Sequence, residues 1–133
     1  MTYLLDSNTC ITYLNGRSTT LLHRMQATPA HEIYLCSIVK AELFYGAAHS
    51  SDPSKELAKL QPFFAAFTSL LFGDRCAEEY GQIRSHLTAA GTLIGPNDLL
   101  IAATARAHGL TLVTHNTREF TRVPGLSIDD WQV

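Results

Sequence analysis

The sequence predicts an α/β protein, a three-layer α/β/α arrangement in which a mostly parallel central sheet is covered by helices on both faces. Short apolar segments rich in β-branched and aromatic residues alternate with longer segments of helical periodicity, a pattern typical of parallel sheets. The 133 residues are 46% hydrophobic and 17% charged. A chain of this length and composition can bury a core of its own, so we expect a single domain over residues 1–133.

The expected strands are short apolar runs that end at polar or turn-forming residues. They cover residues 2–5, 32–36, 69–72, 110–114 and 126–128, the last as an edge strand. The first run stops at Asp6, Ser7 and Asn8, residue types that favour a turn and a helix N-cap. Each strand is therefore expected to present polar side chains at its carboxyl end.

The expected helices follow from the spacing of apolar residues and from their start and stop signals. They cover residues 8–14, 18–27, 38–48, 54–67, 74–90 and 98–108. We expect Ser37, Asp74 and either Asn97 or Asp98 to act as N-caps, and Pro62 to kink or split the fourth helix. Residues 115–120 are expected to form a polar turn.

Composition excludes several classes of protein. The net charge of -2 argues against the uniformly basic surface of a non-specific nucleic-acid binder. Cys10, Cys36 and Cys76 show no paired spacing, which disfavours a disulfide framework or a zinc site and favours the reducing cytosol. The chain has no signal-peptide pattern and no apolar run long enough to span a bilayer, so we expect a cytoplasmic protein without membrane association.

Four polar residues are placed to meet at one edge of the predicted sheet, because sites in such sheets lie outside the carboxyl ends of the strands. Asp6 follows the first strand, and Asn116 follows the strand at 110–114. Glu42 lies in the second turn of the helix after the second strand, and Asp98 stands at the head of the most apolar helix. Taken singly, each aspartate also fits a helix cap, and Glu42 fits a solvent-facing position.

Three carboxylates at one edge would repel one another and raise one another's pKa unless a cation held them together. Oxygen ligands alone favour Mg²⁺ or Mn²⁺ over zinc. The residues therefore predict a divalent metal site.

Four segments, residues 3–8, 41–47, 94–103 and 112–120, resemble the successive motifs of PIN-domain ribonucleases, and most closely those of VapC-type toxins of bacterial toxin–antitoxin pairs. The resemblance extends from Tyr3 to about Trp131 and keeps the order of the motifs. It implies the α/β/α fold and a Mg²⁺-dependent endoribonuclease in which Mn²⁺ can substitute.

The resemblance also implies roles for individual residues. Asp6, Glu42 and Asp98 match the acidic triad, with Asp6 and Asp98 holding the metal and Glu42 positioning or deprotonating its water. Asn116 stands where many members carry a fourth acid, so we expect one firmly held metal. Glu119, three residues further on, is a candidate auxiliary carboxylate.

Contacts to the RNA are expected from polar and basic residues close to the motifs, although ordinary surface charge is the simpler explanation for any single basic one. The candidates are Asn8, Lys40, Thr114, Arg118 and Arg122, with His115 beside the groove.

The aromatic cluster in the first half of the chain is larger than a small sheet would cover, so part of it is expected to form a binding surface. Its members are Phe44, Tyr45, Phe63, Phe64 and Phe67. For this half of the chain the resemblance implies a VapB-like antitoxin as partner, and it implies a homodimer.

Two other readings compete. The loop from Asp6 to Thr9 superficially resembles the nucleophilic loop of haloacid-dehalogenase-like phosphatases, but Asn8 replaces that loop's second aspartate and no later lysine is suitably placed. Alternatively, Asn116 marks a catalytically degenerate PIN-like module that only binds RNA or protein. The complete set of Asp6, Glu42 and Asp98 argues against that second reading.

Overall fold

Five parallel strands form one sheet in the computed structural model, which describes residues 1–133 throughout. The strand order is β3-β2-β1-β4-β5, and every neighbouring pair is parallel. The strands are β1 (Tyr3–Leu5), β2 (Ile33–Cys36), β3 (Thr68–Leu70), β4 (Thr111–Val113) and β5 (Ile128–Asp129). The central strand β1 therefore has its carboxyl end beside those of β2 and β4.

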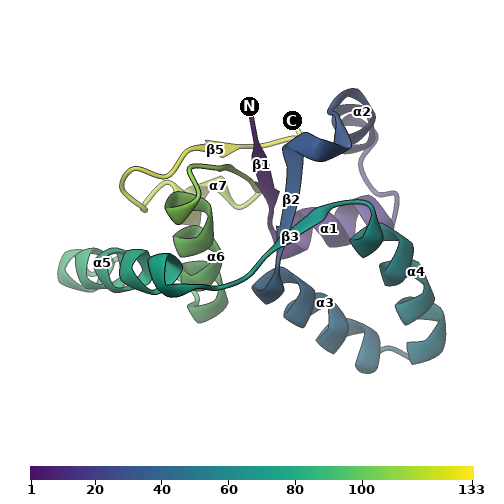
Figure 1. Ribbon diagram of the computed structural model, residues 1–133, viewed down its shortest axis with the longest axis horizontal. Coiled ribbons are helices and arrows are strands. Elements are labelled where there is room, and N and C mark those ends of the chain that lie inside the picture. Colours follow the sequence, from purple (N-terminus) through teal and green to yellow (C-terminus); the bar gives the residue numbers. More distant parts are fainter.

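Parallel pairing requires crossover connections, and helices supply them. The helices are α1 (Ser7–Leu14), α2 (Thr19–Ala27), α3 (Ser37–Ala48), α4 (Pro53–Ala65), α5 (Asp74–Ala90), α6 (Pro96–Ala107) and α7 (Thr117–Phe120), with a 3₁₀ turn η1 (Ala30–Glu32) before β2. Helices α5 and α6 lie on one side of the sheet, and α1, α3 and α4 lie on the other (Figure 1). The predicted α/β/α fold is confirmed.

The core lies on both faces of the sheet, as the unbroken apolar runs of the strands require. Leu4, Leu35 and Leu112 on the three inner strands have no exposed surface. Helix α6 contributes a run of small buried residues, Ala102, Ala103 and Ala105, which allow close packing. The buried cluster therefore surrounds β1 and holds its carboxyl end in place.

Two expected N-caps are wrong because helices begin at those residues. Helix α3 begins at Ser37, directly after β2. The Ser37 hydroxyl instead donates a 3.4 Å hydrogen bond to the carbonyl of Leu70, at the end of β3. Helix α5 begins at Asp74, with Gly73 in the cap position. Ser18 does cap α2, because its hydroxyl accepts the Leu21 N–H at 3.1 Å.

The N-cap predicted for α6 is also wrong. The helix begins at Pro96, so Asn97 and Asp98 already lie inside its first turn and neither caps it. A proline at the first position needs no N–H partner and already has helical φ. The preceding N–H, that of Gly95, is bonded by Glu119 from a distant part of the chain, a contact that local sequence does not encode.

Other boundaries differ where neighbouring segments decide them. Helix α4 continues through Pro62, so the split is wrong; buried Leu60 and Phe63 flank the proline and hold this turn on the core. Residues 117–120 form the short helix α7 rather than a turn. The third and fifth strands are displaced by one or two residues from their expected positions, to the registers that pair with β2 and β4.

All three cysteines are free and buried, as their spacing suggested. None of the helices combines the length and the hydropathy needed to cross a bilayer.

Trp131 closes the core beside the amino end of β1, and its removal should be costly. Its ring packs edge-on against Tyr3 at 4.9 Å, Arg24 lies over it at 5.0 Å, and its indole N–H donates to Asp129 at 3.1 Å. We expect Trp131→Ala to lower the free energy of unfolding by about 3–5 kcal/mol in urea denaturation. Val133→Ala, at an exposed end, should change it by less than about 0.5 kcal/mol. A loss at Trp131 no larger than that of the control would show that the ring does not support the fold.

Candidate active site

Asp6 is a buried carboxylate at the carboxyl end of β1. Its N–H donates to the Val113 carbonyl of β4 at 3.1 Å, and only 4% of the residue is exposed. The Thr9 N–H donates to its Oδ1 at 2.8 Å, so Asp6 is also the N-cap of α1. Burial raises the pKa of Asp6, although hydrogen bonds from Thr114 and Thr9 oppose the rise and the charge of Glu42 adds to it.

Glu42 projects from α3 toward the start of α1. The Ser7 hydroxyl donates to its Oε1 at 2.6 Å, and no lysine or arginine pairs with it. Lys40, two residues earlier in α3, has its ammonium 4.9 Å from the centre of the Phe64 ring. Glu42 is therefore partly exposed, and a hydroxyl rather than a basic side chain holds its carboxylate.

Asp98 and Glu119 meet beside Gly95, which has no side chain to keep them apart. A Cβ at Gly95 would lie 3.3 Å from Asp98 Oδ2 and 3.8 Å from Glu119 Oε1. The Gly95 N–H donates to Glu119 Oε1 at 2.9 Å, and the Asn116 amide donates to Oε2 at 2.6 Å. The chain thus supplies a fourth carboxylate at this edge, three residues beyond Asn116.

These two acids share a hydrogen bond, and their pKa values move in opposite directions. Burial, followed by the hydrogen bond and charge of Glu119 and the charges of Glu42 and Asp6, raises the pKa of Asp98 to about 7. Burial would also raise the pKa of Glu119, but hydrogen bonds from Gly95, Asn116 and Asp98 and the charge of Arg122 hold it below its ordinary value. The proton of the pair therefore resides on Asp98.

The four carboxylates at this edge of the sheet have the chemistry of ligands for a divalent cation. No lysine or arginine forms an ion pair with any of Asp6, Glu42, Asp98 and Glu119, and oxygen donors of this kind suit Mg²⁺ or Mn²⁺. No three acidic, histidine or cysteine side chains converge closely enough to enclose an ion as they stand. The agreement is thus one of donor chemistry and charge, and the side chains have to draw closer to bind an ion.

The residues predicted to contact substrate are dispersed. Thr114 is fully buried, so it has no surface to offer RNA; it donates to Asp6 and accepts the Asn116 N–H. Lys40 lies over Phe64, away from the acids. Asn8 is exposed and shares a hollow with Asn116, and Arg118 is exposed on α7 without a partner.

Two residues of the candidate site were not predicted from the sequence. Ser7 appeared only as a turn residue, although its position beside Asp6 at a strand end was a usable signal. Gly95 gave no signal, because its role is the absence of a side chain.

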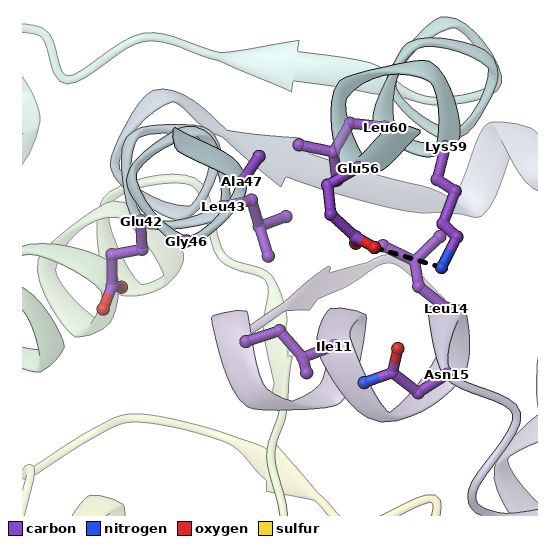
Figure 2. A pocket seen from close by; sticks show the side chains of 10 residues that line it. All are labelled: Ile11, Leu14, Asn15, Glu42, Leu43, Gly46, Ala47, Glu56, Lys59 and Leu60. Atoms are coloured by element: carbon purple, nitrogen blue, oxygen red, sulfur yellow. Dashed lines mark hydrogen bonds and ion pairs between the residues drawn. The ribbon is translucent and has the colours of Figure 1, made fainter. Parts of the chain in front are cut away.

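An apolar groove between α1, α3 and α4 leads to Glu42. Figure 2 shows Ile11 and Leu14 of α1 facing Leu43 of α3 and Leu60 of α4, with Glu42 at one end of the groove. Its volume is about 210 Å³. A peptide segment bound in this groove would end beside the Glu42 carboxylate.

The chain is similar to proteins of one family over nearly its whole length. The PIN domain family matches residues 3–126. A tRNA(fMet)-specific endonuclease VapC from Salmonella typhimurium is 37% identical over 97% of both chains. Ribonuclease VapC2 from Rickettsia felis is 36% identical over 98% of both chains.

Solved structures agree with this similarity. The crystal structure of VapBC2 from Rickettsia felis bound to a DNA fragment from their promoter contains a chain with a TM-score of 0.93, 36% identity and coverage of 98% of this chain and 99% of that one. A chain of FitAcB from Neisseria gonorrhoeae has a TM-score of 0.88 at 28% identity, covering 97% of both chains.

The raised pKa of Asp98 predicts how the stability of the metal-free protein depends on pH. The folded state keeps a proton up to about pH 7, whereas the ordinary value is 3.8. Between these values the folded state binds more protons than the unfolded state, so the free energy of unfolding falls as the pH rises. We expect Asp98→Asn to remove this fall and to stabilise the protein at about pH 8 by about 1–2 kcal/mol, a figure reduced for partial solvent contact.

Urea denaturation in the presence of a chelator at several pH values measures this. Glu78→Gln, at an exposed position of α5, is the matched control and should keep the parent slope. Equal stability of the parent and Asp98→Asn across the window would contradict the assignment of the proton.

Proposed function

The chain belongs to the PIN-domain family and to its VapC branch, and from this membership we propose that it is a Mg²⁺- or Mn²⁺-dependent endoribonuclease that acts as the toxin of a toxin–antitoxin pair. The observation that carries the proposal is the group of Asp6, Glu42 and Asp98 at the carboxyl edge of the sheet, unpaired with any basic side chain. A structural role alone does not require three acids at one edge of the sheet without a basic partner.

Asp6 and Asp98 would hold the cation, and Glu119 is placed to assist because its carboxylate already contacts Asp98. When bound, the cation supplies Lewis-acid activation of water and neutralises charge that develops on the phosphoryl group. Asp6 is held in place by Thr9 and Thr114, so it enters the site with a fixed orientation. Asp98 must give up its proton to bind, which favours binding above about pH 7.

Glu42 is the proposed general base. It would take one proton from the attacking water, whose oxygen forms the new bond to phosphorus as the bond from phosphorus to the 3′-oxygen breaks. The leaving oxygen takes a proton from solvent, so the products carry 5′-phosphate and 3′-hydroxyl ends. The Ser7 hydroxyl, 2.6 Å from Glu42, fixes the orientation of the carboxylate for this step.

The partner we propose is a VapB-like antitoxin, because the similar crystal structures are of VapBC complexes. The groove between α1, α3 and α4 and the exposed side chains of Phe44 and Tyr45 give such a partner an apolar surface. Phe63, another member of the expected aromatic cluster, is buried and belongs to the core. Homodimerisation stays a prediction.

The phosphatase alternative loses support from the structure, because none of the three lysines pairs with Asp6: Lys40 and Lys59 have other contacts, and Lys55 lies on α4. A catalytically degenerate binding module is the remaining alternative. Glu119 weakens it, since this residue brings a carboxylate to the place where Asn116 lacks one.

Cleavage assays test the nuclease directly. Initiator tRNA is the first RNA to try, because the names of the Salmonella and Shigella relatives specify it. We expect chelation of divalent metal to abolish cleavage, and Asp6→Asn or Glu42→Gln to lower kcat/KM by at least about a hundredfold, because charge stabilisation and proton transfer are lost. Glu78→Gln should cleave like the parent.

The ends of the cleaved RNA provide a second readout. A 2′,3′-cyclic phosphate would contradict attack by water. Undiminished cleavage by Asp6→Asn would contradict the proposed site, and a parent protein that binds RNA but never cuts it would favour the binding module.

The role of Ser7 predicts a kinetic pattern. Ser7→Ala should lower kcat about tenfold with little change in KM, because it removes a hydrogen bond to a charged base and touches no substrate. Ser7→Thr keeps the hydroxyl and should retain most of kcat. Equal kcat values for all three proteins in single-turnover assays would remove the positioning role, and a loss in both variants would indicate packing instead.

A further inference from the structure

A second hollow, which is polar, lies next to the four carboxylates of the candidate site. It has a volume of about 460 Å³, and it is lined by Asn8, Ile11, Thr12, Arg17, His115, Asn116 and Gln132. Asn116 links it to the acids, because its amide donates to Glu119 at 2.6 Å. Ile11 lines both this hollow and the apolar groove. The two surfaces therefore meet over α1, and the hollow adjoins the site of the proposed chemistry.

Arg17 is the basic side chain of this hollow, and its backbone is fixed by the end of α1. Gly16 adopts a left-handed conformation with φ of 64°, and the Arg17 N–H bonds back to the Thr12 carbonyl at 3.1 Å. This is the glycine-dependent helix ending in which the residue after the glycine closes the last turn. The guanidinium is exposed and has no hydrogen bond, ion pair or aromatic contact.

Unengaged basic side chains are scarce in this protein. Of the ten lysines and arginines, only Arg17, Lys55 and Arg118 have side chains without a protein partner. The others bind carboxylates, carbonyls, a hydroxyl or aromatic rings: Arg24, Lys40, Lys59, Arg75, Arg84, Arg106 and Arg122. Only Arg17 of the three unengaged residues lines a hollow that adjoins the acids.

His115 presents an oriented ring nitrogen to the same hollow. Its Nδ1 lies 2.9 Å from Asp130 Oδ2, and because an ionised carboxylate only accepts hydrogen bonds, Nδ1 carries a proton. Asp130 is itself held by the Gln132 N–H, which donates to Oδ1 at 2.9 Å. This pair fixes the ring at the edge of the hollow and leaves Nε2 as its available polar atom, which donates a hydrogen bond in the imidazolium form.

We propose that this hollow binds a phosphate of the RNA strand next to the scissile one, through Arg17 and His115. The inference rests on the proposed ribonuclease function. A protein with a net charge of -2 and four clustered carboxylates repels a polyanion, so the strand needs a cationic contact beside the acids as well as the metal. A guanidinium matches the paired oxygens of a phosphate, and an imidazolium held by a carboxylate adds a directed donor through Nε2.

Binding of initiator tRNA tests the inference separately from cleavage. All proteins, including the parent of this comparison, carry Asp98→Asn to suppress cleavage. The dissociation constant is measured by fluorescence anisotropy at several salt concentrations. We expect Arg17→Ala to weaken binding about tenfold, and to reduce the slope of log K against log salt by about 0.7–1, because one phosphate contact is lost. His115→Ala should weaken binding about threefold, and Arg17→Lys should keep the salt slope.

Arg84→Ala is the control, because it removes an equal charge from α5, where the guanidinium contacts only Tyr80. It should leave both the affinity and the slope close to those of the parent. Arg17→Ala with parent affinity and parent slope, or a loss equal to that of Arg84→Ala, overturns the inference. RNA that fails to bind the parent even at low salt overturns it as well.

Failure of the proposed function has a different signature. In that case the unsubstituted protein, with Asp98 intact, does not cleave RNA in the presence of Mg²⁺ or Mn²⁺, whatever the effect of Arg17→Ala on binding. The two measurements therefore separate a mistaken phosphate site from a mistaken activity.

Discussion

The burial of the Asp6 carboxylate at the end of the central strand is the constraint on which the site depends. A carboxylate withdrawn from water loses several kcal/mol of solvation unless hydrogen bonds or a cation replace it. Here the Thr9 N–H and the Thr114 hydroxyl supply hydrogen bonds, and each comes from an element that β1 aligns. The same carboxylate caps α1, so the start of that helix and the position of the acid are a single feature.

The remaining acids are arranged around Asp6 by different means. Glu42 is held by Ser7 from α1, and Asp98 lies against Glu119, whose carboxylate accepts the Gly95 N–H. The repulsion between these groups is relieved by placing a proton on Asp98. Carboxylates that need a proton to lie this close together would gain stability from a bound cation, as expected of a functional centre rather than a structural one.

The surfaces around the acids differ in character, and α1 connects two of them. One side of this helix borders the apolar groove that ends at Glu42, and its C-terminal end carries Arg17 beside the polar hollow. A partner in the groove and a phosphate in the hollow would both lie beside Ile11.

Much of the fold could be predicted from the sequence, and so could the strand ends at which the candidate site lies. The alternation of apolar strands and amphipathic helices determined the parallel sheet, and the rule that sites lie at strand ends brought Asp6, Glu42 and Asp98 together, with motif resemblance naming their chemistry. Local sequence did not determine the start of α6, the helix at 117–120, the burial of Thr114 or the position of Lys40. Each of these depends on a contact between segments distant in sequence: Glu119 on the Gly95 N–H, Thr114 on Asp6, Lys40 on Phe64. Side-chain partners of this kind exist only once the sheet has brought the segments together, and that tertiary step decided which polar residues lie at the candidate site, which support them and which remain on the surface.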